Sequence, residues 1–276
     1  MAKLVFDKDG ERLYETGVKE GVLFVKDGDD WSEGIVWNGL TAVTESPSGA
    51  ESTALYADDA KYLNLLSAEE FGATIEAYSS PEEFDECDGT FAIAPGVTIG
   101  QQTRKPFCFA YKTVLGNDSE GNDYGHKLHF IFNAKAAPSE RAYATVNDSP
   151  EAITLSWELS TTPMKVEDSP LKPVSNLTLN SVEMLKGDAN GVTHKKAYGM
   201  IMASIYGCDA FVADKLYKFG DVVIEDGKLY ICDVETFQGA FDDTKFIEID
   251  DATGIGNSKL LTPGDLYLIA TTYIDD

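Results

Sequence analysis

The chain has 276 residues, of which 43% are hydrophobic and 11% aromatic, and this composition excludes a disordered chain and supports a packed core. Its 47 acidic residues face only 22 Lys and Arg, for a formal net charge of −25 at pH 7. Such a charge repels polyanions, and without a basic patch we expect no binding to a nucleic acid backbone. A solvated acidic surface is the simplest alternative explanation.

The cysteines and the first residues indicate a protein made in a reducing cytoplasm. No CxxC pair occurs among the four cysteines, which are Cys87, Cys108, Cys208 and Cys232. We therefore expect four free thiols. The opening MAKLVFDKDG contains no apolar stretch, so we expect no signal peptide. No apolar run approaches the roughly 20 residues of a membrane span, and we expect no membrane partner.

Strands dominate the predicted elements. Apolar residues alternate with polar ones, or form short apolar runs, in five segments bounded by Gly, Asn, Asp or Pro. In chain order these are residues 21–25, 74–78, 107–112, 128–132 and 152–160. In the last segment the residues from Ile153 to Leu159 are apolar at every second position, which predicts one face in a core. The polar stretch 116–125 predicts an exposed hairpin loop.

A different pattern occupies residues 39–60, GLTAVTESPSGAESTALYADDA. This stretch is rich in Ser, Thr, Gly and acid, yet its two ends look like strands. The combination predicts a long protruding β-hairpin arm, and a mobile surface loop is the alternative.

Helix signals are few. The sequence SPEE at residues 80–83 predicts a short capped helix that ends at about Cys87. A second helix is predicted over residues 193–206, just before Gly207. Its apolar residues form one stripe, which indicates contact with a core rather than a ligand site.

The composition changes after Pro163, where MKVEDSPLKPVS indicates an extended linker. Further along, two apolar runs flank Asp226-Gly227, which is a strong hairpin signal. A small separate β module is therefore expected. The expected domains are residues 1–208, with residues 251–276 returning to them, and residues 209–250.

The sequence contains no recognisable catalytic or metal-binding constellation. His126 and His129 are three residues apart on an expected strand, so they should point to opposite faces. The glycines within residues 254–259 lack the spacing of a phosphate loop, and the acids near residues 7–9 and 118–123 lack the EF-hand register. We therefore expect a binding or structural protein without enzyme activity, cofactor or metal. A hydrolase with two catalytic acids is an alternative that no residue favours.

Long consecutive stretches resemble the major tail tube proteins of long-tailed bacteriophages. They are GLTAVTESPSGAESTALYADDAKYLNLLSAEEF, ATIEAYSSPEEFDECDG, APGVTIGQQTRKPFCFAYKTVLGND and YGHKLHFIFNAKAAPSERAYATVNDSPEAITLSWELSTTP. The likeness covers about residues 35–163, and KPVSNLTLNS at residues 172–181 continues it.

The resemblance implies a mainly β subunit, namely a β-sandwich with one short flanking helix and a long hairpin arm. Six subunits would form a ring whose inner sheets join into one continuous β-barrel. Rings would stack around a tape-measure protein, together with other tail proteins, in the bacterial host cytoplasm. Genomic DNA would later pass through the virion tail without specific binding. The arm, residues 40–58, would reach into the neighbouring ring, with candidate contacts at Thr44, Glu45, Ser46, Glu51 and Tyr56.

The lumen of this family tends to be acidic, which suggests which strand faces line the channel. The polar residues of strand 152–160 would look either into the lumen or onto the outside of the tube. The candidate lumen residues are Thr154, Ser156 and Glu158 on this strand and Glu76 on strand 74–78. We expect at least one of Glu76 and Glu158 to line the channel.

The module at residues 209–250 departs from the family. Its YKFGDVVIEDGKLYIC faintly resembles small carbohydrate-binding β modules. The alternative function is thus a carbohydrate-binding virion or surface protein. The candidate glycan-facing aromatics are Tyr217, Tyr230 and Phe237, which could equally form the core of the module. Plain exterior decoration is the simpler expectation.

The charge of the chain leads to a testable prediction. Because every copy carries the same net charge of −25, like charges should slow assembly at low ionic strength. We expect the assembly rate at fixed protein concentration, measured by light scattering, to rise from about 50 to about 500 mM NaCl as the Debye length shortens. A rate that falls with added salt would contradict this expectation.

Overall fold

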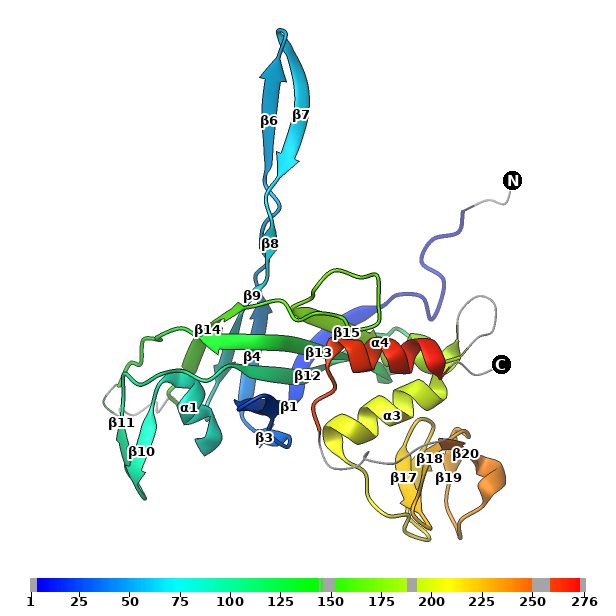
Figure 1. The fold of residues 1–276 in the computed structure, drawn as a ribbon. Coiled ribbons are helices and arrows are strands. Elements are labelled where there is room, and N and C mark those ends of the chain that lie inside the picture. The colour runs from blue at the N-terminus through cyan, green and yellow to red at the C-terminus, as the bar shows by residue number, and fades with distance from the viewer. Residues whose placement is uncertain (1–3, 144, 146–151, 188–192, 250–258, 274–276) are drawn as a thin grey trace.

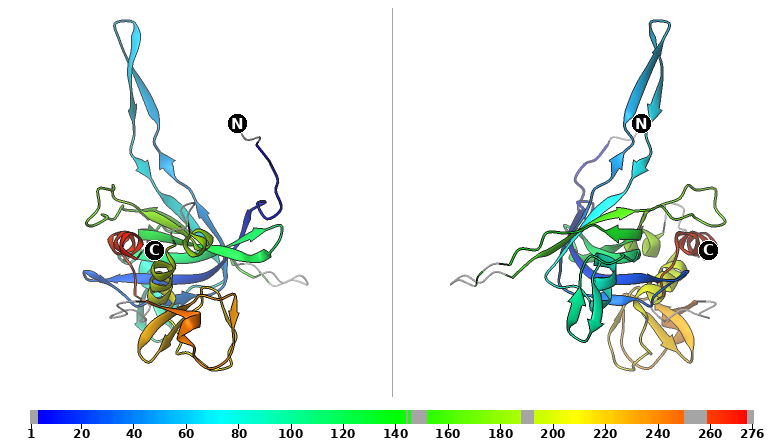
Figure 2. Two further views of the ribbon diagram at one scale, coloured as in Figure 1. Left: turned by 90° about the vertical axis from the view of Figure 1, so that its right-hand side faces the viewer. Right: turned by 60° about the vertical axis from the view of Figure 1, so that its left-hand side comes forward.

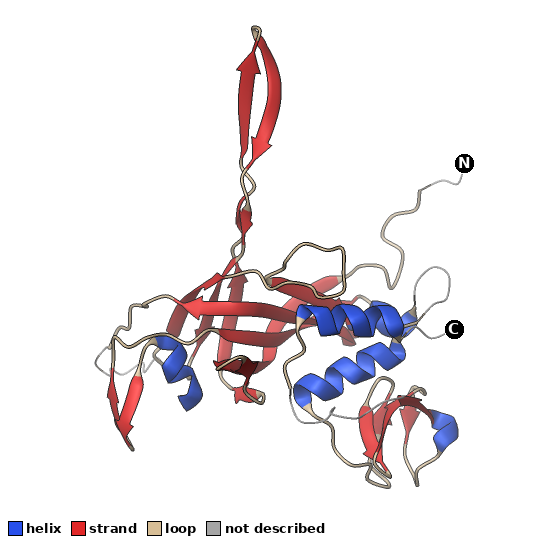
Figure 3. Ribbon diagram, in the orientation of Figure 1, coloured by secondary structure: helices blue, strands red, loops and turns tan. Residues whose placement is uncertain are grey.

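The computed structural model describes residues 4–143, 145, 152–187, 193–249 and 259–273. Figure 1 shows one large twisted sheet, an arm that rises from it, the helices α3 (Lys195–Tyr206) and α4 (Pro263–Thr272) on one side, and a small β module next to these two helices. The chain is mainly β, which confirms that level of the prediction, and Figure 3 shows how strands outnumber helices. Within the described residues, no helix has both the length and the apolar character needed to cross a membrane.

The large sheet is antiparallel throughout. Its strands in spatial order are β1 (Tyr14–Asp27), β12 (Phe107–Asn117), β13 (Gly121–Ala136), β14 (Leu155–Thr161), β9 (Gly72–Ala77) and β4 (Leu40–Glu45). Three shorter strands extend it, namely β2 (Asp30–Trp31) and β3 (Ile35–Trp37) beside β1, and β15 (Asn176–Asn180) beside β13. Aromatic and β-branched residues fill these strands because they pack well on a pleated surface.

The sheet curls round on itself, so that β4 at one end of the strand order lies beside β1, although no β1–β4 pairing is present in the described residues. Leu23 of β1 pairs with Phe109 of β12 on one edge and with Ile35 of β3 on the other. Only two residues separate β3, which pairs with β1, from β4, which is the last strand of the order. The chain therefore brings that end of the sheet back to β1. Gly39 makes the bend between them with φ +80°, and a Cβ there would lie 3.0 Å from Ser79 Oγ.

Aromatic side chains fill the closed interior. The rings of Trp37, Phe84 and Trp157 are buried, with centroids 4.6 Å to 5.4 Å apart. Trp37 Nε1 donates a hydrogen bond of 2.8 Å to the Ser79 carbonyl, which satisfies the polar group of the indole. Phe84 comes from the 3-10 helix η1 (Glu82–Phe84), which leads into α1 (Asp85–Asp88). The η1–α1 segment therefore supplies a buried ring to the interior.

The opposite face of β1, β12 and β13 packs against helices. The helices are α2 (Ser181–Lys186), α3 (Lys195–Tyr206) and α4 (Pro263–Thr272). Phe24 and Phe130 of the sheet share a buried cluster with Ile201 of α3. Thr262 and Asp265 form a capping box at the start of α4. As a result, β12 and β13 are buried on both faces.

The C-terminal module is built from short strands. They are β16 (Tyr217–Lys218), β17 (Val222–Glu225), β18 (Lys228–Cys232), β19 (Thr236–Phe237) and β20 (Phe246–Ile249), with the 3-10 helix η2 (Asp243–Lys245) before β20. Tyr217 and Phe246 belong to its own small core, whereas Leu229 and Ile231 join the cluster around α3. The module is thus packed onto the main domain. Residues 250–258 lie outside the described residues, and the domain division stays a prediction.

The expected protruding arm is present and is longer than predicted. Its root is formed by β5 (Ser48–Gly49) and β8 (Glu69–Glu70), and its outer hairpin by β6 (Ser52–Ala57) and β7 (Ala60–Leu66). Its chain returns to the sheet only after Glu70, well beyond the expected end at residue 60. Gly49 is required near the root because a Cβ there would lie 2.2 Å from the Ala68 carbonyl oxygen.

A second hairpin was not predicted from the sequence. It consists of β10 (Phe91–Ala94) and β11 (Val97–Ile99), joined by a Pro-Gly turn. In Figure 1 it points away from the large sheet in the direction opposite to the arm.

Three element boundaries differ from expectation. β14 begins at Leu155, so Ile153 lies outside the strand and is 41% exposed. The expected loop at residues 116–125 is mostly strand, because β12 and β13 stay paired up to Asn117 and Gly121. η1 begins after Pro81 and has no side-chain cap, so the prediction that Ser80 caps this helix is wrong. In residues 116–125, strand pairing outweighs the local turn propensity of the polar residues.

Phe84→Ala tests the closed interior. It removes a fully buried ring, so we expect the free energy of unfolding to fall by about 3–5 kcal/mol. Phe91→Ala is the matched control, because Phe91 is 49% exposed on the second hairpin, and should change it by less than about 0.5 kcal/mol. Urea unfolding followed by tryptophan fluorescence measures both. Equal losses in the two variants would contradict the packing described above.

Candidate assembly surfaces

The outer hairpin of the arm carries an exposed apolar face. Leu55 pairs with Leu63, and Thr53 with Leu65, so these four side chains share one face of the ribbon. The three leucines are 41%, 38% and 54% exposed in chain order. Among the described strands, β6 and β7 pair only with each other. The leucine face is therefore uncovered within one copy.

The root of the arm is fixed to the large sheet. Tyr111 Oη donates a hydrogen bond of 2.9 Å to Glu45 Oε1, at the last residue of β4. The Ser46 amide donates to the Gly72 carbonyl at 2.8 Å, which joins the two chains of the arm where they leave the sheet. The direction of the arm is thus set by the sheet, while its outer half is free of it.

The structure separates the residues that the sequence assigned to inter-ring contacts. Thr44 and Glu45 lie in β4 within the large sheet, and Ser46 lies at the root. Of the candidates, only Glu51 and Tyr56 belong to the protruding part, where Tyr56 is 73% exposed. The expected arm ended too early to include the leucines of β7, although the Leu-Asn-Leu alternation at residues 63–65 signals a strand.

Polar side chains cluster at the arm root. The ring of His129 stacks on Tyr111, with centroids 4.8 Å apart. His129 Nε2 lies 3.4 Å from Glu15 Oε1, and its Nδ1 lies 3.9 Å from Glu45 Oε1. Burial lowers the pKa of His129 although both carboxylates oppose the shift. The imidazole is therefore neutral at pH 7 and links β1 to the end of β4, just before the arm, by polar contacts.

Three of the four candidate lumen residues share one face of the sheet. Glu76 of β9 is paired with Ser156 of β14, and Glu158 of β14 is paired with Thr74 of β9. Alternation places these side chains on the face away from the aromatic interior. Thr154 precedes β14 and is exposed outside this ladder. The result is a patch of carboxylates and hydroxyls.

His126 lies on the other face of β13, beside α3. Its Nε2 is 3.3 Å from Tyr198 Oη, whereas His129 contacts Tyr111, so the expected opposite orientation of the two histidines is confirmed. Burial, assisted by Lys112, lowers the pKa of His126 to about 4. Within the described ranges, no three His, Cys, Asp or Glu side chains are grouped to hold a metal ion.

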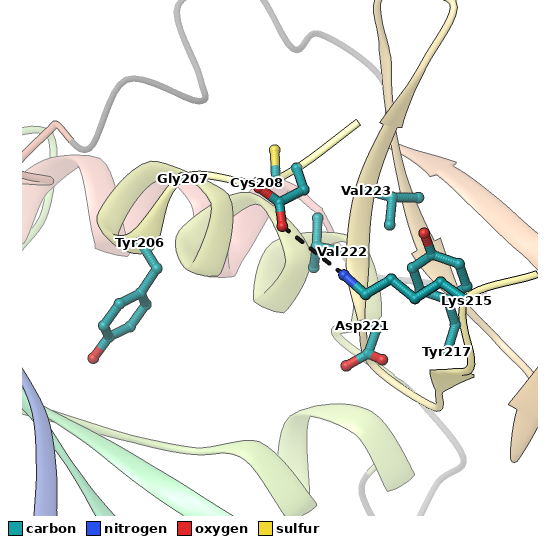
Figure 4. Close-up of a pocket in the computed structure, with 9 residues that line it drawn as sticks. Tyr206, Gly207, Cys208, Lys215, Tyr217, Asp221, Val222 and Val223 are labelled. Atoms are coloured by element: carbon teal, nitrogen blue, oxygen red, sulfur yellow. Dashed lines mark ion pairs between the residues drawn. The ribbon is translucent and has the colours of Figure 1, made fainter. Parts of the chain in front are cut away.

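A polar cleft of about 470 Å³ lies between the end of α3 and the module (Figure 4). Asp209 and Lys215 form an ion pair of 3.9 Å in its wall. Tyr217 lines the cleft but is only 2% exposed, and its Oη accepts a hydrogen bond from the Val212 amide.

The other two candidate glycan-facing aromatics pack within the module. The ring centroid of Tyr230 is 5.0 Å from that of Phe241, and the centroid of Phe237 is 5.4 Å from that of Phe246. Both residues are partly buried beside the core that contains Tyr217. The three aromatics thus contribute to packing and do not form a flat exposed platform.

No family model and no curated protein matches this chain. We therefore infer the function from the geometry of this chain. The described residues include three exposed features, which are an apolar arm, a second hairpin and an acidic sheet face.

His126 should make stability depend on pH. Its folded-state pKa of about 4 lies below the ordinary value of 6.5, so the unfolded chain binds more protons and stability is lost as pH falls from about 6.5 to about 4. We expect His126→Gln to remove on the order of 2 kcal/mol of this loss, measured by urea unfolding at each pH. His129 acts in the same direction, so part of the slope should remain. An unchanged slope in His126→Gln would contradict the assignment.

Proposed function

We propose that this protein is the structural subunit of a bacteriophage tail tube. Copies would form rings, expected to be hexameric, that stack around a tape-measure protein. The main support for the proposal is the arm, whose two-stranded ribbon leaves the sheet (Figure 2). Its leucine face is exposed in one copy. An isolated hairpin is marginally stable in water, so a ribbon of this kind needs a covering partner. A second copy of the chain is the partner that the proposal names.

The direction of the arm supports repeated assembly. It projects from one end of the molecule only, so a contact between the arm of one copy and the body of another would join unlike surfaces. Contacts between unlike surfaces generate rings or open filaments rather than closed dimers. A stack of rings is closed within each ring and open along the stack, so it contains both kinds of contact.

The edges of the sheet support association within a ring. In the described part of the chain, β15 pairs with β13 alone, so its outer edge presents unpaired backbone groups. Unpaired edges are a liability in a free protein. Pairing between neighbouring subunits would satisfy these groups and join the sheets around the ring.

The acidic patch supports passage of DNA without binding. Glu76 and Glu158 share a face with two hydroxyl side chains, in a chain of net charge −25. A wall of that kind repels phosphates, so DNA would slide along it. We place this face toward the lumen. A tube structure with both glutamates on its outer surface would exclude that placement.

Negative-stain electron microscopy tests the function directly. The purified full chain is concentrated over a range of salt and imaged. Hollow tubes with a regular axial repeat are the expected result. If the chain stays monomeric alone and also in the presence of the tape-measure and initiator proteins, the proposal fails.

Leu63→Asp tests the role of the arm. The substitution places a carboxylate in the leucine face, so we expect the protein concentration needed for tube formation to rise at least about tenfold. The monomer should keep its fold, measured by circular dichroism, because the site is exposed in one copy. Leu171→Asp is the control, since Leu171 is 57% exposed outside the arm. Normal assembly of Leu63→Asp would show that the arm face is not a contact.

A further inference from the structure

A groove of about 430 Å³ lies where β4 approaches β1 without pairing with it. Its apolar lining comes from Val18 of β1, Val36 of β3, Leu40 of β4 and Tyr206 of α3. Val36 is 65% exposed, and the other three side chains are partly buried. This β1–β4 groove is therefore an apolar surface that the fold of one copy leaves open.

The irregular path of β1 creates the groove. The pairing of β1 with β12 shifts its register on both sides of Lys19, and Glu20 has a φ of 54°, so β1 departs from a regular ladder here. Pairing of β1 with β3 begins only at Gly21, and β4 pairs only with β9 among the described strands. The Glu20 carbonyl accepts a hydrogen bond of 3.1 Å from Tyr206 Oη. Beyond that contact, two strand edges border the groove without a ladder between them, which favours association with another molecule.

The charged side chains at the groove leave one ammonium group in excess. Lys19 and Glu20 line the groove, and Lys112 Nζ lies 2.5 Å from Glu20 Oε2. Lys19 Nζ lies 3.7 Å from the other oxygen of Glu20, and the Lys19 side chain is 51% exposed. One carboxylate therefore faces two ammonium groups. The complementary occupant is an apolar segment that carries acid.

The outer hairpin of the arm has that character. Its leucine face is exposed in one copy. Asp58 and Asp59 form the turn at its tip, next to that face. Together with Glu51 they outnumber Lys61, the single base of the hairpin. The hairpin thus offers apolar side chains to the lining of the groove and carboxylates to Lys19.

The arm and the groove lie on opposite sides of the molecule. In Figure 1 the arm rises above the large sheet, whereas β3, which borders the groove, lies below it. A contact between the two surfaces joins copies end to end and leaves a free arm and a free groove at the ends, so it can repeat.

We propose that the leucine face of the arm of one copy packs into the β1–β4 groove of a second copy. This inference rests on the proposed function, in which the arm is a contact between copies. It adds the surface that receives the arm.

The groove beside the second hairpin fits the arm less well. This groove of about 770 Å³ is lined by five carboxylates against two ammonium groups, from Asp27, Glu82, Glu83, Asp85 and Glu86 and from Lys26 and Lys105. Its acids would repel Asp58 and Asp59 at the tip of the arm. The β1–β4 groove is therefore the better match for the arm.

Disulfide cross-linking between full-length copies tests the contact. One population carries Leu63→Cys and the other carries Val36→Cys. Both also carry Cys208→Ser, because the other three native thiols are buried. An affinity tag on one population separates mixed products from products of like copies. Under mild oxidation, mixed dimers should form at least about tenfold faster than between Leu63→Cys and the control Leu171→Cys, because a disulfide requires close Cα atoms.

A charge exchange tests the position of the arm tip. Lys19→Glu in the Val36→Cys copy should slow mixed cross-linking at least about fivefold. Asp58→Lys/Asp59→Lys in the Leu63→Cys copy should restore the rate. Lys172→Glu is the control, since Lys172 is exposed outside the groove and its charge changes by the same amount. Circular dichroism of each variant should match that of the parent chain.

The remaining occupants are outcomes of the same experiment. Phe6→Cys in place of Leu63→Cys asks whether the exposed N-terminal segment fills the groove instead. Faster cross-linking from Phe6→Cys assigns the groove to that segment and overturns the proposal. Products that join only Leu63→Cys copies indicate a contact between two arms and overturn it as well, as does the absence of any mixed product.

The results also separate this contact from the proposed function. Tubes seen by microscopy without mixed cross-links would leave the tube standing and remove only the β1–β4 groove as the receiving surface. Mixed cross-links in a chain that never forms tubes would keep the contact and remove the tube.

Discussion

The burial of β12 and β13 on both faces is the constraint on which the rest of the structure depends. One face encloses Trp37, Phe84 and Trp157, and the other is covered by α3 and α4. With its central strands sealed in this way, the sheet has little broad apolar surface left for another molecule. In the proposed assembly, association between copies would then use the free edge of β15 and the segments that extend from the body. The arm, the second hairpin and the N-terminal segment extend from it, and all three expose large apolar side chains.

Much of the fold could be predicted from the sequence because the alternation of apolar residues is strong where a core exists. The helix at α3 and the hairpin between β17 and β18 also followed from local signals, a terminal glycine and an Asp-Gly turn. The prediction was wrong where pairing overrides local preference. The polar residues after Asn117 look like a loop, yet β13 has already begun at Gly121 because it stays paired with β12.

The assembly surfaces were harder to predict for a physical reason. Trp157 and Leu159 alternate along β14 just as Leu63 and Leu65 alternate along β7, but the first pair is buried and the second is exposed. A periodic pattern reports that a face is apolar and does not report which molecule covers it. The hairpin at residues 91–99 was missed for the same reason, because its apolar residues contribute to no core of their own chain. Alternation places Glu76 and Glu158 each on the polar face of its own strand, but the pairing of β9 with β14 that brings them together was not predicted.

The attachment of the arm has a mechanical consequence. The two chains of the arm continue directly into β4 and β9, which are paired from Leu40 to Glu45 and from Ala73 to Ala77. In Figure 1 these two strands run roughly along the direction of the arm. A force that pulls on the arm therefore loads many backbone hydrogen bonds in shear at once, including those between β9 and β14. Bonds loaded together resist far more force than bonds opened one after another, so the subunit should stay folded under a load that breaks the contact proposed for its arm.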